Sequence, residues 1–245
     1  NDFRADQVVT GGVLAAEKDC LVIDLPRVKY PDWALHSVHL LHPLTAADFC
    51  LAAGGKKTVT ANVIGVIENQ APTRHLRLKV TPENGEIKAD VSQDIAKVAL
   101  VERHRRSGKI QVGLVQGFGF REKCAIASTV AHDCHNMMVV GTDDENMAIA
   151  ANELAKQDGG QIVVRNGEVI GRVELPIAGL MSNEIAKVVS RKAATVLEGF
   201  RACGCQLNNP NMQLSLLVLV VIPELRISDL GLVDVTKFDF VPVLE

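Results

Sequence analysis

The sequence has no apolar run long enough to cross a membrane. Its longest apolar stretch, LSLLVLVVIP at 214–223, is only half of the roughly 20 residues that a membrane-spanning helix requires. We interpret residues 214–222 as a buried strand, since a short apolar run bounded by turn residues is typical of one. No charged and then apolar leader opens the chain. The sequence therefore predicts no membrane span and no secretory signal.

An excess of charge of one sign is also lacking, because 26 Lys and Arg residues face 29 Asp and Glu residues. Nucleic acids and anionic membranes attract clustered basic surfaces, so we expect neither as a partner and favour a small polar or neutral ligand. Six cysteines in 245 residues are too few for a disulfide scaffold, which predicts a reducing, cytoplasmic location. The chain opens at Asn1 with a strand-turn-strand pattern, which predicts missing residues or a piece of a longer polypeptide.

The phosphate-binding pattern GxGxxG and internal repeats are absent as well, which argues against a dinucleotide-binding fold. Short β-type runs with local turns are present instead. The dipeptides Asn84-Gly85 and Asn166-Gly167 predict hairpin turns. The sequence therefore predicts an α+β fold of mixed or antiparallel sheets with inserted helices. The runs expected to form strands lie at 7–25 (a hairpin), 58–68, 75–80, 86–89, 96–104, 110–119 and 161–175.

Three stretches predict the inserted helices. Thr45, with Asp48 three residues later, predicts a short helix through a variant of the capping box. The segment TDDENMAIAANELAKQDGG predicts a helix that Thr142 caps and that a Gly-Gly pair ends. A third helix is expected over 182–202, and the segment 26–43 is interpreted as a linker. Two of its histidines, at 36 and 39, have metal-like spacing, but a surface connection or a helix face is the simpler interpretation.

The most polar motif is HDCHN at 132–136, which lies between two apolar runs. His132 and His135 are three residues apart, so a helical turn would place both rings on one side, whereas an extended strand would separate them. Neutral imidazole binds first-row divalent metals, and Asp133 or Asn136 can add an oxygen or orient a ring. The motif is therefore a candidate metal or catalytic site.

Two histidines and one acid make an incomplete metal site, so further ligands must come from elsewhere. Glu102 and His104, at the end of a strand that can lie beside the first, are the best local source. The alternative is a polar turn whose side chains satisfy loop backbone groups. Cys134 is interpreted as a small packed residue, because a thiol nucleophile needs a lowered pKa that spacing does not indicate.

Two further segments contain polar groups at the ends of elements. LPIAGLMS at 175–182 places small residues before the predicted helix start at Ser182, where backbone N–H groups can hold an anion or a polar ligand edge. Glu224 and Arg226 follow the apolar run and can form an ion pair or line a pocket. Ordinary helix entry and a structural ion pair are the simpler interpretations.

Taken together, the order of these segments resembles the C-terminal domain of bacterial adenine deaminases, which belong to the amidohydrolase superfamily. The resemblance covers most of residues 41–245 and is specific, because six separate motifs occur in the family's order. These motifs are VALVERH, GLVQGFGF, AIASTVAHDCHNMMVVGT, GGQIVVRNGEVIG, LPIAGLMS and VIPELRISDLGLVDV.

The resemblance implies hydrolysis of adenine to hypoxanthine and ammonia at a divalent metal centre, manganese or iron. That centre lies in a barrel domain whose His-x-His motif has no counterpart in this chain. Residues 1–40 then correspond to returning strands of the amidohydrolase β-sandwich plus a linker, and 41–245 to the C-terminal α+β domain. The implied partners are the barrel domain, adenine or a related purine, and further copies of the chain in a homo-oligomer.

The resemblance also assigns roles to the candidate residues. The chain is expected to be inactive without the barrel, while contributing a pocket wall, an auxiliary metal site or a dimer surface. The predicted site residues are His132, Asp133 and His135 as catalytic groups, Asn136, Glu102 and Ser182 as substrate-binding groups, and His132, His135 and His104 as auxiliary metal ligands.

The sequence departs from the family pattern at a few positions. Cys134 stands where the family usually has serine, and Asn211 and Gln213 lie where a Phe-Met-Thr-Leu pattern is usual. These differences leave open a related enzyme that acts on another purine or amidine. The alternative to an enzyme is that the chain is a stand-alone, noncatalytic purine-binding or assembly module.

Overall fold

The computed structural model describes residues 4–26 and 28–245, and the chain divides into two compact units. The described residues up to Pro31 form the first unit, an antiparallel sheet with the strand order β1-β2-β3. Its strands are β1 (Gln7–Thr10), β2 (Val13–Glu17) and β3 (Cys20–Leu21). The hairpin predicted over 7–25 is thus confirmed.

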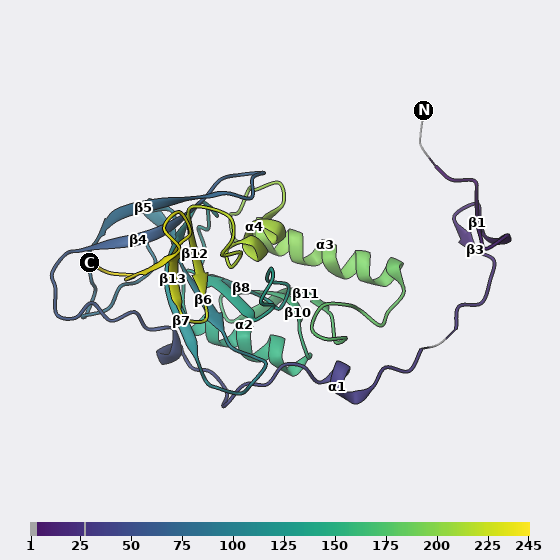
Figure 1. The fold of residues 1–245 in the computed structure, drawn as a ribbon, viewed down its shortest axis with the longest axis horizontal. Coiled ribbons are helices and arrows are strands. Elements are labelled where there is room, and N and C mark those ends of the chain that lie inside the picture. Colours follow the sequence, from purple (N-terminus) through teal and green to yellow (C-terminus); the bar gives the residue numbers. More distant parts are fainter. Residues whose placement is uncertain (1–3, 27) are drawn as a thin grey trace. The chain divides into compact units, whose positions relative to one another are not determined.

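The second unit, Asp32–Glu245, is built around an eight-stranded sheet with the order β11-β10-β8-β9-β6-β7-β4-β5 (Figure 1). Every neighbouring pair is antiparallel except β4 and β7, which are parallel. The mixed sheet confirms the predicted fold class. Its strands are β4 (Val59–Val66), β5 (Thr73–Val80), β6 (Ile95–Val101), β7 (Ile110–Gln116), β8 (Cys124–Ser128), β9 (Met137–Gly141), β10 (Gly160–Arg165) and β11 (Glu168–Glu174).

Helices cover both faces of this sheet, which explains why its central strands β6, β8 and β9 are buried along their whole length. Successive residues of β6 alternate between the two faces: Val98 and Leu100 pack towards α3 (Ala186–Ala202), whereas Ala99 and Val101 pack towards α2 (Asp144–Lys156). A small antiparallel sheet also packs on the α3 side. Its strands are β12 (Leu225–Ser228), β13 (Gly231–Asp234) and β14 (Asp239–Val241).

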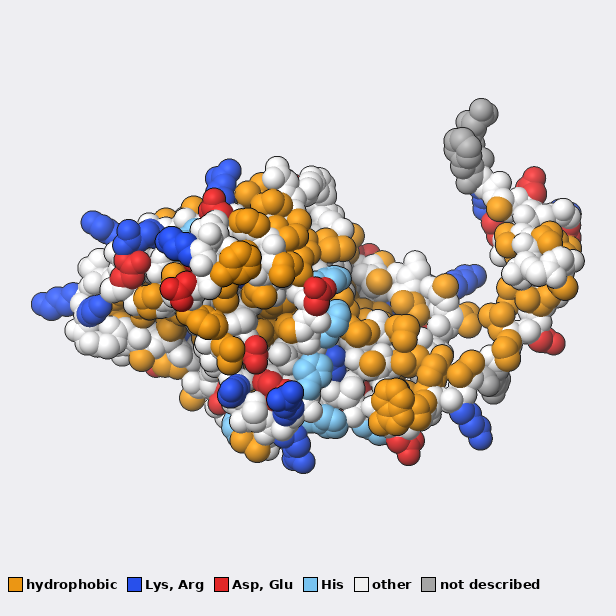
Figure 2. Space-filling view, viewed as in Figure 1, with side chains coloured by type: hydrophobic (Ala, Val, Ile, Leu, Met, Phe, Trp, Pro, Cys, Tyr) orange, Lys and Arg blue, Asp and Glu red, His pale blue; other side chains and the backbone are white. Residues whose placement is uncertain are grey.

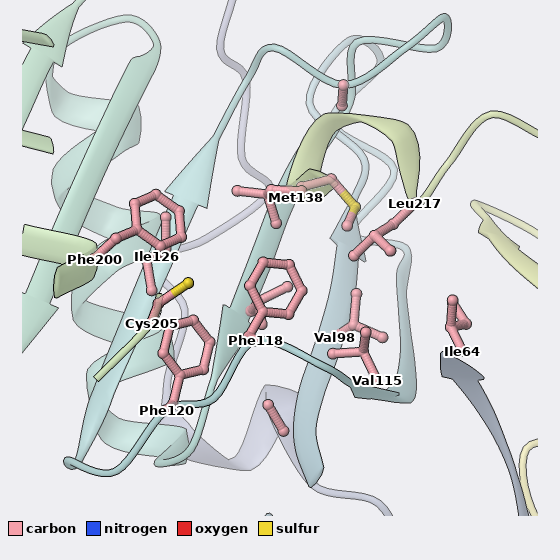
Figure 3. Close-up of a cluster of buried hydrophobic side chains, with 14 of the residues drawn as sticks. Ile64, Val98, Val115, Phe118, Phe120, Ile126, Met138, Phe200, Cys205 and Leu217 are labelled. Atoms are coloured by element: carbon pink, nitrogen blue, oxygen red, sulfur yellow. The ribbon is translucent and has the colours of Figure 1, made fainter. Parts of the chain in front are cut away.

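The core on the α3 side holds a cluster of aromatic side chains (Figure 3). Phe118 and Phe120 are stacked with ring centroids 5.3 Å apart, and Phe200 of α3 lies 6.4 Å from Phe120. The motif GLVQGFGF therefore supplies packing groups.

The predicted turns are confirmed, while the strand predicted over 86–89 is wrong. Asn166 and Gly167 both have positive φ and connect β10 to β11, and Asn84 and Gly85 form a tight turn with the same backbone conformation. Residues 86–89, however, form no strand, and Glu86 makes only isolated bridges to Ala52 and Glu83.

The helix ends differ in detail from those predicted. The predicted helix at Thr45 is a short 3-10 helix, η1 (Ala46–Phe49). Asp143 and not Thr142 caps α2, since its carboxylate accepts from the backbone N–H of Asn146 at 3.0 Å. The hydroxyl of Thr142 donates instead to the carbonyl oxygen of Glu122 at 2.6 Å. Two further short helices are α1 (Asp32–Leu35) and η2 (Val91–Gln93).

The strand predicted over 214–222 is wrong. The segment contains the end of α4 (Pro210–Leu216) followed by turns. Asn209 caps this helix by accepting from the N–H of Met212, and Pro210 occupies its first turn, where a missing N–H costs nothing. In the part of the chain that the structure describes, no helix has both the length and the apolarity needed to cross a membrane.

Candidate functional site: a histidine loop joined to two neighbouring turns

The HDCHN motif lies in the loop that connects β8 to β9, two buried neighbouring strands of the large sheet. The loop turns back on itself, because the N–H of His135 donates to the carbonyl oxygen of Ala131 at 2.7 Å. The rings of His132 and His135 consequently lie on the same side, with centroids 5.7 Å apart. Figure 2 shows several histidine side chains gathered near the middle of one face of the molecule.

The two histidines have different surroundings. The N–H of His132 donates to the carbonyl oxygen of Ser215 in α4 at 2.9 Å, while its ring atom Nδ1 is buried without a hydrogen-bond partner among the described residues. Burial, and then the neighbouring imidazole of His132 and the positive charge of Arg103, lower the pKa of His135. Its neutral form is therefore favoured, which suits a proton acceptor or a ligand.

Asp133 and Cys134 lie at the exposed tip of the loop. The interpretation of Cys134 as a packed residue is therefore wrong. Partial desolvation, with a smaller contribution from Asp229, raises the pKa of its thiol. A protonated thiol is a poor nucleophile, so no nucleophilic role follows for Cys134.

His104 approaches the same loop, but its ring is engaged with backbone. Its Nε2 lies 3.0 Å from the carbonyl oxygen of Cys134. Within residues 4–26 and 28–245, no group of three His, Cys, Asp or Glu side chains has the arrangement of a metal site. The metal-ligating side chains among these described residues therefore do not by themselves fit the metal ion that the family resemblance implies. His36, similarly, contacts the carboxylate of Asp158 at 3.1 Å.

Glu102 organises the loop that follows β6. Its carboxylate accepts hydrogen bonds from the backbone N–H groups of His104, Arg105 and Ser107, and from the Ser107 hydroxyl at 2.7 Å. Desolvation opposes ionisation, but these hydrogen bonds prevail and lower the pKa of Glu102 to about 2. Both carboxylate oxygens are thus engaged by its own loop, which makes Glu102 a support of that loop in this structure.

The structure reveals a central residue that sequence reasoning missed. Arg103 is 1% exposed and donates to the carbonyl oxygens of three segments that are far apart in the sequence. Its Nε donates to His135 at 2.6 Å, its Nη1 to Ser37 at 2.8 Å and its Nη2 to Ala178 at 3.0 Å. No sequence signal distinguishes it from the other arginines of the run ERHRR.

The turn at 175–182 meets the histidine loop through this arginine and through Thr129. The hydroxyl of Thr129 donates to the carbonyl oxygen of Gly179 at 2.6 Å and accepts from the N–H of Gly160 at 2.7 Å. Ser182 accepts from the N–H of Glu184, and α3 begins only at Ala186. The helix start predicted at Ser182 is therefore wrong, since the turn precedes α3 by several residues.

The predicted Glu224–Arg226 ion pair is also wrong. Glu224 accepts from the backbone N–H of His75 at 2.7 Å, while the fully buried Arg226 donates to carbonyl oxygens, including that of Leu216 at 2.7 Å. Leu216 adjoins Ser215, which accepts the His132 N–H. This segment therefore supports the end of α4 on which the histidine loop rests.

A separate hollow of about 460 Å³ lies between the segment 38–43 and α2. Its lining includes Leu41, Arg106 and Lys156 but none of the predicted site residues. Volume alone would favour this hollow as a ligand site. His135, Glu102 and Arg103 have shifted pKa values and lie at the histidine loop and the adjoining end of β6, so we keep this loop as the candidate site.

Comparisons with known proteins identify the family of the chain. A family model described as the adenine deaminase C-terminal domain matches residues 70–239, which include every predicted site residue. The chain is 50% identical over 246 residues to "Adenine deaminase" of Ruegeria pomeroyi, covering 100% of this chain and 41% of that protein. It is 48% identical over 254 residues to "Adenine deaminase 3" of Rhizobium meliloti, covering 98% and 43%.

A more distant relative gives the same picture. The chain is 45% identical over 240 residues to "Adenine deaminase" of Moorella thermoacetica, covering 98% of this chain and 40% of that protein. The chain therefore spans about two fifths of the length of the curated relatives it matches.

Proposed function

The chain belongs to the adenine deaminase C-terminal domain family, and from this premise we propose that it serves an enzyme that hydrolyses adenine to hypoxanthine and ammonia. The observation that carries the proposal is the similarity to adenine deaminases along the whole chain, at 45–50% identity for the three relatives above. The chain acts as the C-terminal portion of that enzyme, because the match leaves about three fifths of each relative uncovered.

The reaction requires groups that the described residues do not bring together. Water attacks C6 of adenine, the C–N bond breaks, and ammonia leaves with a proton that a general acid delivers. A divalent metal, manganese or iron, lowers the pKa of that water when bound. The histidine loop does not fit such an ion by itself. We therefore assign the principal metal to a barrel domain outside this chain and expect the isolated chain to be inactive.

The histidine loop contributes to the purine pocket of that enzyme. His132 and His135 hold or move protons near the substrate, supported by the favoured neutral form of His135 and by the unpartnered Nδ1 of His132. Asp133, at the exposed tip, completes the catalytic group. Asn136 and Ser182 contact the purine edge. Glu102, predicted to bind substrate, acts on it indirectly by shaping the adjacent loop.

The first unit joins the barrel side of the enzyme. Its strands expose apolar side chains that a sheet normally buries against another layer, among them Val9, Val13 and Leu21. This exposure supports the assignment of residues 1–40 to returning strands of a β-sandwich and its linker. Assembly into a homo-oligomer is a further part of the proposal.

A calorimetric titration separates this function from the alternative of a stand-alone purine-binding module. If the pocket is shared with another domain, the isolated chain presents only one wall of it, and adenine up to about 1 mM should give no saturable heat. Hypoxanthine, titrated in parallel, controls for weak stacking. Saturable binding of adenine by the isolated chain would favour the alternative module.

A further inference from the structure

Arg103 is a buried cation whose guanidinium has no carboxylate partner among the described residues. Its hydrogen-bond acceptors are the carbonyl oxygens of His135, Ser37 and Ala178, and the Ser37 hydroxyl at 2.9 Å. Burying a charge is costly unless it is well hydrogen-bonded, so the three segments and the arginine depend on one another. Burial accordingly lowers the pKa of Arg103 to about 10, which leaves it charged at neutral pH.

The backbone of Arg103 strengthens the same connections. Its N–H donates to the side-chain oxygen of Asn136 at 3.3 Å, and its carbonyl oxygen accepts from the N–H of His39 at 2.8 Å. The guanidinium is planar and holds its donors in a fixed fork, so it fixes the relative positions of its acceptors. A flexible lysine with a single ammonium group cannot hold all three carbonyl groups in that plane.

The neighbouring turn is shaped to receive this guanidinium. Gly179 has φ +72°, and a Cβ atom there would lie 2.9 Å from both Nη1 and Nη2 of Arg103. Glycine is therefore required at this position both by its backbone conformation and by the close approach of the arginine. The turn and the histidine loop are consequently joined through a contact that a single methyl group would disturb.

We propose that Arg103 is a positioning residue that fixes the His135–Asn136 end of the histidine loop against the 175–182 turn and thereby sets the geometry of the purine site. The link to the purine site rests on the proposed function, whereas the positioning itself does not. Arg103 does not contact the substrate, and its effect passes through the backbone of His135 and through Asn136.

The positioning is tested by hydrogen exchange on the 245-residue chain. R103M removes all side-chain hydrogen-bond donors while retaining apolar bulk. G179A disturbs the contact between Gly179 and the Arg103 guanidinium, and it serves as the second variant in case R103M does not fold. We expect amides of 131–136 and 177–181 to exchange at least about tenfold faster, with the amides of β6 and β10 unchanged. K97M is the matched control, since Lys97 is also buried but lies at the opposite end of β6. Unchanged exchange in both segments would overturn the positioning role.

The consequence for catalysis is tested in the full-length enzyme that contains this sequence. R103M is expected to lower kcat/KM for adenine by about 100-fold, because a displacement of about 1 Å near a reacting group has effects of that size. R103K should recover part of the lost kcat/KM, and the kcat/KM of K97M should equal that of the wild type. KM should rise as well, whereas a mere loss of folded molecules would lower kcat alone.

The outcomes distinguish the two proposals. If the wild-type enzyme does not deaminate adenine, the proposed function fails, and hydrogen exchange still decides the role of Arg103. If R103M loosens both segments but leaves kcat and KM for adenine unchanged, the link between Arg103 and the purine site is wrong.

Discussion

The isolated 245-residue chain is expected to convert no adenine to hypoxanthine, even with Mn²⁺ or Fe²⁺ added. Enzymes accelerate reactions by at least about 10⁶-fold. The deamination of adenine depends mainly on a metal-activated water for this acceleration. No group of three metal-ligating side chains is assembled in the described part of the chain. The measurement is hypoxanthine formation over hours at high protein concentration, which detects even a small residual activity.

Two controls make this result informative. The full-length enzyme, assayed under the same conditions, should turn over adenine. The second unit of the isolated chain should unfold in a sharp thermal transition, which shows that inactivity is not a result of misfolding. Metal-dependent turnover by the folded, isolated chain would contradict the assignment of the metal centre to another domain.

Gly160→Ala is expected to destabilise the large sheet severely. Gly160 starts β10 with φ +123°, and a Cβ atom there would lie 2.0 Å from the carbonyl oxygen of Val173. Backbone of the paired strand β11 cannot move away cheaply, so we expect a loss of about 4 kcal/mol or more in the free energy of unfolding. For a domain of this size the melting temperature should fall by roughly 10 °C.

Gly167→Ala is the matched control in the turn that follows the other end of the same strand. Gly167 has φ +84°, but a Cβ atom there meets nothing within 4 Å. The cost should therefore be only the left-handed backbone conformation, about 1 kcal/mol. The melting temperatures of the two variants separate the steric clash in Gly160→Ala from the backbone strain in Gly167→Ala. Equal melting temperatures would show that β11 yields at Val173.

The fold could be predicted where local signals agree with the tertiary structure. The Asn166-Gly167 dipeptide predicts its hairpin because both residues adopt positive φ readily, and tertiary contacts do not oppose it. The strand prediction at 214–222 is wrong because apolar residues suit a buried helix as well as a buried strand. The signals that decide the matter, Asn209 as a cap and Pro210 in the first turn, lie just before the run.

The candidate site is predictable as a motif but not as an arrangement. The spacing of His132 and His135 predicts adjacent rings on a turn, and the structure places their centroids 5.7 Å apart. The contacts of Arg103 join residues 66 and 75 positions away in the sequence, and its carbonyl acceptors have no sequence signature. The partners of Glu102 are likewise backbone groups without a sequence signature. The sequence therefore predicts a substrate contact for Glu102, whereas in the structure its carboxylate accepts hydrogen bonds from its own loop.

The central claim is that the histidine loop forms part of an adenine deaminase site. The most direct test measures kcat/KM for adenine in the full-length enzyme with both His132 and His135 changed to alanine. Loss of positioned acid–base groups predicts a decrease of at least about 100-fold. H36A/H42A is the control, because both of these side chains are exposed and lie in the 26–43 segment. An unchanged kcat/KM in the H132A/H135A enzyme would contradict the claim.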